Sequence, residues 1–252
     1  MMKNIAYYTL SPLIFFLVWE ILSRTGFIDI RFFPAPSLIF IHLFTVSPDE
    51  GILRDIVASL YRISLGYLLG TLTGISLGIA MGLSKLLRNG CYPLVAMLYP
   101  LPKIALLPLI MLVFGIGDLS KIVVVFIGSF FLILLSTLNA VDQIPRLYYD
   151  LAKVNTLKKS AFIKNVIFPA SLPGIFNGLR LAIGYSLVIV VAAEFSGANE
   201  GVGYLIWQSW ETFSIRSMYA GIFVIAFLGI VFSYIIDIAE RKALHWHPKY
   251  LN

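Results

Sequence analysis

The chain has 252 residues, of which 59% are hydrophobic and 13% are charged. Soluble domains carry about 25% charged residues, so this composition excludes an ordinary soluble protein and indicates an integral membrane protein with one domain, residues 1–252. The net charge of +6 does not indicate a nucleic-acid partner, because the cations lie between apolar segments and at the C-terminus. The single cysteine, Cys91, excludes an internal disulfide and a cysteine-based metal site.

Six apolar segments predict an all-α integral membrane fold with six transmembrane helices and both termini in the cytoplasm. The expected spans are residues 5–22, 60–83, 92–114, 121–140, 172–195 and 218–238. The first is expected to be a span rather than a signal peptide, because only Lys3 precedes it and no small-residue cleavage site follows. Segment 24–59, in which acids nearly balance bases, is expected outside, with Ser37 capping a helix that begins at Leu38.

The second expected span carries a glycine at every fourth position: Gly66, Gly70, Gly74, Gly78 and Gly82. This spacing places a smooth face along one side of a helix, which lets another helix approach closely. Internal packing is the favoured interpretation. A subunit interface or a translocation path is the alternative.

The third expected span follows a short cytoplasmic turn at residues 84–89 and has Lys103 about halfway along. Four prolines interrupt it: Pro93, Pro100, Pro102 and Pro108. Prolines are tolerated in membrane helices where neighbours or water satisfy the freed carbonyl groups. A mid-span lysine is a functional candidate because it is costly in lipid, and Lys103 lies too far from the start of the span to reach the membrane edge easily. Pro102 and Lys103 are therefore assigned to the translocation pathway.

The fourth expected span is β-branched and aromatic with no ionisable residue after Lys121, which is typical of either a lipid-facing or a core helix. The polar segment that follows, residues 141–171, is expected to be a cytoplasmic loop because of its positive excess. Its cations are Arg146, Lys153, Lys158, Lys159 and Lys164.

This loop is patterned as two short amphipathic helices. Leu147, Leu151 and Val154 share one helix face, and Asn155-Thr156 then interrupts the pattern. A second helical run containing Phe162 is expected to end at Pro169, because proline has no N–H for the helix. A basic element with one apolar face predicts a docking surface for a cytoplasmic partner.

The same loop resembles the EAA loop of ABC-transporter permeases of the binding-protein-dependent importer type. Asp150-Leu151-Ala152 falls on the Glu-Ala-Ala of that family, Thr156 on its glycine and Phe168-Pro169 on its Leu-Pro. The spacing matches, although only part of the residue pattern does. Asn155 tolerates a left-handed conformation, so the bend is expected there or at Thr156. The resemblance implies an ATPase-coupling role for Asp150, Leu151, Ala152, Val154, Asn155, Thr156 and Phe162.

The last two spans contain few charges. Arg180 lies near the cytoplasmic end of the fifth span and Glu194 closes it near the outer face, and both are assigned to the translocation pathway. The pair His245 and His247 in the C-terminal tail lacks a third ligand, so no metal site is expected.

Two further stretches, residues 100–121 and 193–206, resemble the nitrate, sulfonate and taurine branch of the same permease family. The resemblance implies a type I ABC importer-like permease in the bacterial inner (cell) membrane. It also implies three kinds of protein partner: a cytoplasmic ABC ATPase dimer, an extracellular or periplasmic solute-binding protein, and a second copy of this chain. The implied solute is a small sulfonate-, taurine- or nitrate-like anion, with a vitamin-precursor-like pyrimidine or flavin as the alternative.

The sequence contains no glycine-rich phosphate loop and no catalytic constellation, so neither an enzyme nor a cofactor is expected. A secondary transporter is the other alternative. Such a protein requires coupling-ion carboxylates or broken helices in paired repeats near the midplane, and no mid-span acid or repeat is visible.

Overall fold

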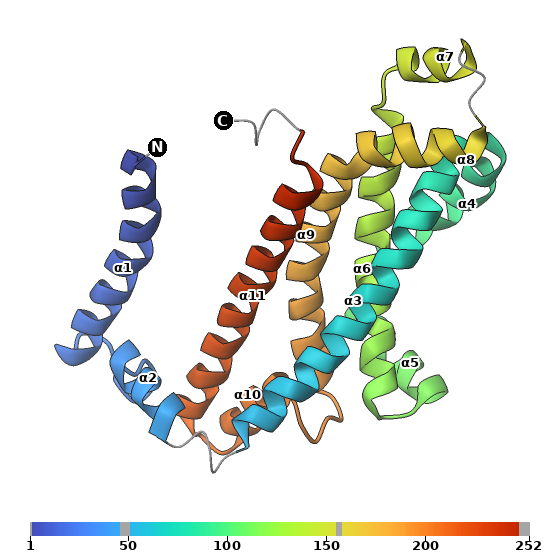
Figure 1. Cartoon of the computed structure of the whole chain (residues 1–252). Coiled ribbons are helices and arrows are strands. Elements are labelled where there is room, and N and C mark those ends of the chain that lie inside the picture. Colours follow the sequence, from blue (N-terminus) through green and yellow to red (C-terminus); the bar gives the residue numbers. More distant parts are fainter. Residues whose placement is uncertain (1, 46–50, 155–157, 247–252) are drawn as a thin grey trace. The chain divides into compact units, whose positions relative to one another are not determined.

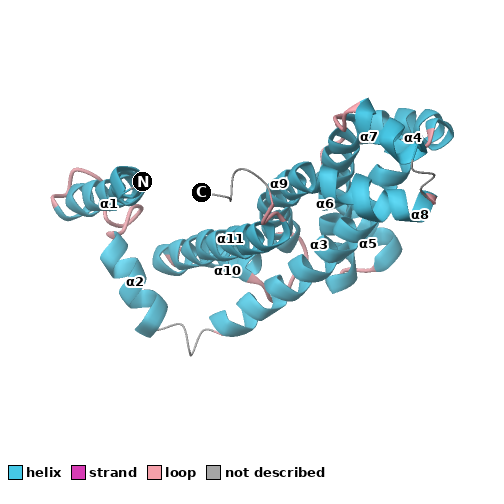
Figure 2. Ribbon diagram, turned by 45° about the horizontal axis from the view of Figure 1, so that its top comes forward, coloured by secondary structure: helices cyan, strands magenta, loops and turns pink. Residues whose placement is uncertain are grey.

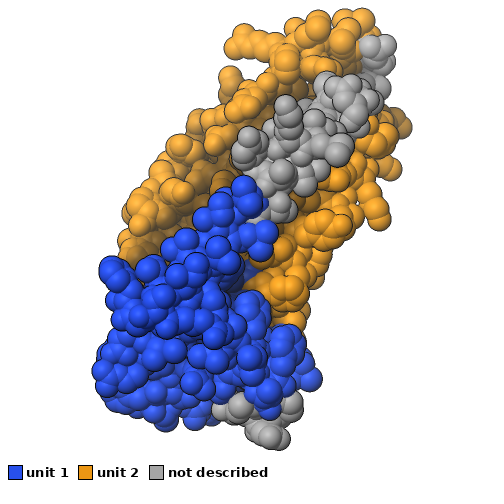
Figure 3. Space-filling view, turned by 90° about the vertical axis from the view of Figure 1, so that its left-hand side faces the viewer, with its two compact units in different colours: residues 1–58, 199–226 blue, residues 59–198, 227–252 orange. Residues whose placement is uncertain are grey.

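The computed structural model describes residues 2–45, 51–154 and 158–246, without the side chains of residues 2–9 and 153. Within these ranges all regular structure is helical (Figures 1 and 2), which confirms the all-α expectation. The chain divides into two compact units (Figure 3). Unit 1 contains residues 1–58 and 199–226, and unit 2 contains residues 59–198 and 227–252.

Four helical runs in the described residues are long and apolar enough to cross a membrane. They are α3 (Ile52–Leu83), α6 (Asp118–Asp142), the run Lys159–Glu194 and α11 (Ile215–Ala243). A fifth candidate is a bent pair, α4 (Lys85–Leu98) with the segment Lys103–Phe114. The first expected span coincides with α1 (Met2–Arg24), a helix of 23 residues.

The third expected span is not one continuous helix. It breaks into α4, a 3-10 turn η1 (Lys103–Leu106) and α5 (Leu107–Phe114), with a bend of 90° between the two halves. Pro100 and Pro102, separated only by Leu101, remove two backbone donors where the helix stops. A broken or re-entrant segment therefore replaces the expected straight span.

Two expected loops are also helical. The helix α3 begins at Ile52, eight positions before the expected start, and the cytoplasmic turn expected at 84–89 is almost entirely part of α4. Only Ser84 separates the two helices, and its hydroxyl accepts a hydrogen bond from the Leu87 N–H as an N-cap. A single capping residue is enough to end one helix and start another.

The expectation that Pro169 ends a helix is wrong. Residues Lys159–Glu194 form one helical run in which α8 (Lys159–Phe162), a π-turn η2 (Ile163–Ile167) and α9 (Phe168–Glu194) follow each other directly. In the π-turn the Phe168 N–H donates to the Ile163 carbonyl, five residues back. The wider turn changes the register of the helix just before Pro169. The helix can therefore continue past a residue that has no N–H to donate.

The helix α6 is the core of unit 2, and more than half of its residues are buried. It packs along α9, where small residues allow the close approach: a Cβ added to Gly174 or Gly178 would overlap Ala140 or Ser136 of α6. Of the two expectations for the fourth span, core packing is therefore the one observed.

The glycine stripe of α3 also faces α6. A Cβ at Gly66 would lie 2.7 Å from the Ile122 carbonyl oxygen and one at Gly78 would lie 2.7 Å from Cβ of Thr137. The stripe therefore serves internal packing, which is the interpretation that the sequence favoured. Atoms of α6 occupy the space that side chains at these positions would need.

Unit 1 holds its helices together with polar and aromatic contacts. The Glu20 carboxylate of α1 accepts hydrogen bonds from Ser37 N–H (3.0 Å) and Oγ (2.7 Å) at the start of α2 (Pro36–Thr45). The Trp19 ring packs 5.6 Å from Tyr219, and Asp55 accepts a 2.7 Å hydrogen bond from Gly201 N–H, just before α10 (Val202–Glu211).

Candidate functional site

The helix α7 (Arg146–Val154) forms the first half of the expected docking element (Figure 1). Leu147, Leu151 and Val154 are 64%, 50% and 81% exposed, respectively, while Ala152 is buried. An apolar helix face is normally buried against something, so a face this exposed within the chain is a surface suited to a partner. Asn155 and Thr156, which were expected to form the bend of the coupling loop, lie outside the described residues.

Phe162 lies on the inner side of this element rather than beside the exposed face. Its ring packs edge-on against Tyr149 of α7, with ring centroids 5.4 Å apart. Both rings pack on a buried cluster of Val141, Ile144 and Ile167. Burial raises the pKa of Tyr149, which is consistent with a phenol shielded from water. Phe162 therefore braces α7 against the end of α6 and the π-turn.

An ion pair ties the same end of unit 2 together. The Arg88 guanidinium of α4 donates two hydrogen bonds, each 2.8 Å long, to the two carboxylate oxygens of Asp142 at the end of α6. This fork-to-fork geometry fixes orientation as well as distance. The helix α7 thus begins four positions after Asp142, which is clamped to α4.

Lys103 caps the free carbonyl groups at the break in the third expected span. Its buried ammonium group donates hydrogen bonds to the carbonyls of Leu98 (2.9 Å), Tyr99 (2.7 Å) and Leu101 (2.8 Å). It also lies 4.7 Å from the centroid of the Phe131 ring. A helix that ends in an apolar region leaves carbonyl oxygens without partners, and a cation at its C-terminus satisfies them.

A cavity of about 370 Å³ opens beside this break. The break supplies Tyr99, Pro102 and Lys103 to its wall, α6 supplies Phe131 and α9 supplies Tyr185. The expected pathway residues Pro102 and Lys103 therefore lie together at the same cavity.

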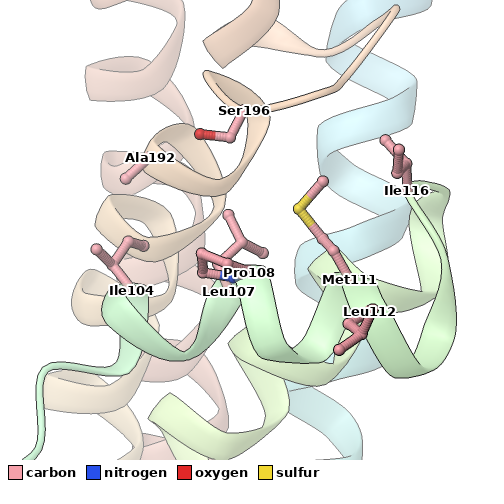
Figure 4. A pocket seen from close by; sticks show the side chains of 8 residues that line it. All are labelled: Ile104, Leu107, Pro108, Met111, Leu112, Ile116, Ala192 and Ser196. Carbon is pink, nitrogen blue, oxygen red and sulfur yellow. The ribbon is translucent and has the colours of Figure 1, made fainter.

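A second cavity, of about 640 Å³, is lined mainly by apolar side chains (Figure 4). Its lining comes from η1, α5 and the region around the end of α9: Ile104, Leu107, Pro108, Met111, Leu112, Ile116, Ala192 and Ser196. It offers no charged side chain to a solute. Its composition suits a lipid chain or an apolar protein surface better than an anion.

Glu194 lies in a buried polar cluster. The Arg62 guanidinium donates to Glu194 (2.7 Å) and to Asp118 (2.7 Å), and the Ser59 hydroxyl also bonds the Glu194 carboxylate (2.8 Å). The Arg62 and Glu194 side chains are only 3% and 0% exposed. Lys121 lies nearby and donates to the carbonyls of Ile116, Gly117 and Gly197 at 3.1–3.3 Å. Sequence reasoning missed Arg62, although an arginine inside an apolar, glycine-rich helix was a usable signal.

Arg180 forms a second bridge, between α9 and α11. Its guanidinium donates to Asp237 (2.5 Å) and Glu240 (2.6 Å). The structure thus places Arg180 and Glu194 in ion pairs, and it brings neither of them to the cavity at the break. In the residues that the structure describes, no group of three His, Cys, Asp or Glu side chains could hold a metal ion.

Residues 70–245 match the family model described as "Binding-protein-dependent transport system inner membrane component". SsuC of Bacillus subtilis (strain 168), named for aliphatic sulfonates transport, is 31% identical over 96% of this chain and 87% of its own length. NrtB of Synechococcus elongatus, named a nitrate import permease protein, is 34% identical over 73% of this chain and 66% of its own. TauC of Escherichia coli (strain K12), a taurine transport system permease protein, is 30% identical over 91% of this chain and 86% of its own.

Solved structures share the fold at lower identity. The inward-facing MetNI methionine ABC transporter contains a chain that matches with a TM-score of 0.66 and 19% identity. The match covers 76% of this chain and 95% of that chain. The arrangement of helices is therefore that of a type I ABC transporter permease.

Proposed function

Because this chain belongs to the family of binding-protein-dependent transport system inner membrane components, we propose that it is the permease subunit of an ABC importer for a small anionic solute. The observation that carries the proposal is the exposed apolar face of α7, held between two membrane-crossing runs. The chain has no phosphate-binding loop of its own, so its energy comes from a separate cytoplasmic ATPase.

The docking face consists of Leu147, Leu151 and Val154, with Asp150 and Ala152 on the same short helix. The partner ATPase provides an apolar groove for this face, and Asp150 meets a cation at its edge. Phe162 and Tyr149 transmit the movement of α7 to α6 and α9, because they join it to the buried cluster at the ends of both helices.

One chain presents one docking helix, so a pair of ATPases requires two permease copies around a two-fold axis. In this assembly the docking loop and both termini lie in the cytoplasm, and the chain spans the bacterial inner membrane. A solute-binding protein outside the membrane delivers the solute. Closure of the ATPases moves the docking helices as rigid bodies and opens the pathway alternately to each side.

The solute class follows from the relatives, whose names specify aliphatic sulfonates, nitrate and taurine. Pro102 and Lys103 border the pathway, since both line the cavity at the break. Glu194 and Arg180 brace the helices around it through their ion pairs. A basic residue at the break is compatible with an anion and unfavourable for a cation.

The test is co-purification of the assembled transporter from cells that express this chain with its ATPase and binding protein. Leu151→Asp or Val154→Asp places a charge in the apolar groove, and we expect the ATPase to be lost while the permease still inserts in the membrane. Leu53→Asp is the matched control, because Leu53 is 75% exposed but lies on α3, in the segment expected outside. If the complex stays intact and active with Leu151→Asp or Val154→Asp, α7 is not the docking helix.

A further inference from the structure

We propose that the cavity at the break is an oxyanion contact site in which the hydroxyls of Tyr99 and Tyr185 hydrogen-bond the solute, while Lys103 supplies charge but no hydrogen bond. This inference rests on the proposed function and adds the groups that recognise the solute. Tyr99 comes from the turn after α4 and Tyr185 from α9, and both line the cavity.

Lys103 by itself cannot bind an anion directly in this arrangement. An ammonium group has three donors, and all three are used by the carbonyls of Leu98, Tyr99 and Leu101. Its positive charge nevertheless remains at the cavity wall, where little water screens it. The lysine therefore sets the sign of the potential, and other groups must provide the directional contacts.

The two tyrosines have hydroxyls available for this purpose. Tyr99 is 43% exposed and Tyr185 is 37% exposed, and neither hydroxyl makes a hydrogen bond to another described residue. A phenol can donate to the oxygens of a sulfonate or a nitrate, and a bond to a charged acceptor is stronger than a neutral one.

The remaining wall fits a small anion with an apolar part. No Asp or Glu lines the cavity among the described residues, so no acid repels an oxyanion there. The other lining side chains include Leu132, Leu181 and Phe131, which exclude water and can cover an alkyl group. A volume of about 370 Å³ is at the small end of ligand pockets, which matches a small solute.

Gly128 places one of these tyrosines. A Cβ on Gly128 would lie 3.4 Å from Cε1 of Tyr185 and would overlap Ile189. The bare backbone of α6 at this position therefore lets the Tyr185 ring and Ile189 approach the helix closely. The location of the ring beside the cavity is thus set by helix packing rather than by a flexible side chain.

The experiment measures solute uptake by the full transporter in proteoliposomes. Each assay contains the same saturating concentration of solute-loaded binding protein. The probes are taurine, ethanesulfonate and nitrate, with a neutral pyrimidine as comparison. Tyr99→Phe and Tyr185→Phe each remove one hydroxyl and keep the ring. Tyr234→Phe is the control, since Tyr234 is 65% exposed on α11 and lies outside the cavity.

We expect the uptake rate of the transported anion to fall about tenfold in each cavity variant and to stay unchanged in Tyr234→Phe, because one hydrogen bond to a charged group is lost. Equal co-purification of the ATPase with all four proteins shows intact assembly. If both cavity variants take up the anion at the wild-type rate, this inference is refuted and the proposed function is not. If the wild-type transporter moves only the pyrimidine, or none of the probes, the anion importer itself is refuted along with the site.

Discussion

The Arg62 guanidinium lies 2.7 Å from the Glu194 carboxylate, and the two residues are 132 positions apart in the chain. The pair joins α3 to the end of α9, and Asp118 at the start of α6 binds the same guanidinium. Three helices of unit 2 therefore meet at one buried arginine. A charge kept at such a position is costly to desolvate, and it is stable only while its partners remain in place.

Replacing Arg62 by alanine should destabilise the protein by about 3–5 kcal/mol, because the Glu194 charge would be left buried without its arginine. The measurement is thermal unfolding of the detergent-solubilised protein. Arg54→Ala is the control: Arg54 also pairs with a glutamate, Glu200, at 2.6 Å, but its side chain is 76% exposed. An exposed pair contributes about 0–1 kcal/mol, so equal losses in the two variants would contradict the buried-pair argument.

Gly70→Ala should disrupt the packing of α3 on α6. The added Cβ would overlap Ser129 Oγ and lie 3.0 Å from the Phe130 backbone nitrogen, so the helices must separate. We expect a loss of about 1–3 kcal/mol, as for other overpacked cores, read from the same unfolding assay.

Gly184→Ala is the matched control for that variant, because nothing lies within 4 Å of a Cβ at this helical position. Alanine there should be neutral or stabilising by up to about 1 kcal/mol, since glycine is a poor helix former. A stabilising Gly70→Ala would show that α3 and α6 are not packed as closely as described.

Lys103→Met should lower stability even though methionine is apolar and fits a membrane segment. The substitution leaves the carbonyls of Tyr99 and Leu101 without the lysine donor, and each unsatisfied group costs about 1–3 kcal/mol. The Leu98 carbonyl keeps its 3.3 Å hydrogen bond from the Leu101 N–H. Reduced yield of folded protein and a lower Tm are the expected readouts. Lys85→Met, at an exposed position near the start of α4, should leave both unchanged.

Phe162→Asp and Val154→Asp should both abolish coupling, but for different reasons. The charge at Phe162 enters the buried cluster with Val141, Ile144 and Ile167, so amide hydrogen exchange in α7 should become faster. The charge at Val154, which is 81% exposed, should leave exchange unchanged and only block the partner. Unchanged exchange in Phe162→Asp would mean that Phe162 does not brace α7.

The class of the protein and the position of the helix with the exposed apolar face follow from the sequence alone. Composition indicated a membrane protein, apolar length located four of the expected spans, and the spacing of Leu147, Leu151 and Val154 predicted the apolar face of α7. The stripe of glycines in α3 also predicted close helix packing. These inferences succeed because periodicity and hydropathy are local properties, and the membrane imposes them on each segment separately.

The contacts between distant residues depend on tertiary packing. The partners of Arg62 and the inward position of Phe162 depend on segments that the chain brings together after the helices form. The carbonyls that Lys103 binds lie within five positions of it, and the break in the helix makes them available. The π-turn before Pro169 likewise converts an expected helix end into a continuous run. A helical pattern specifies which face is apolar. It does not specify which neighbouring helix covers this face, or which residue pairs with a buried charged side chain.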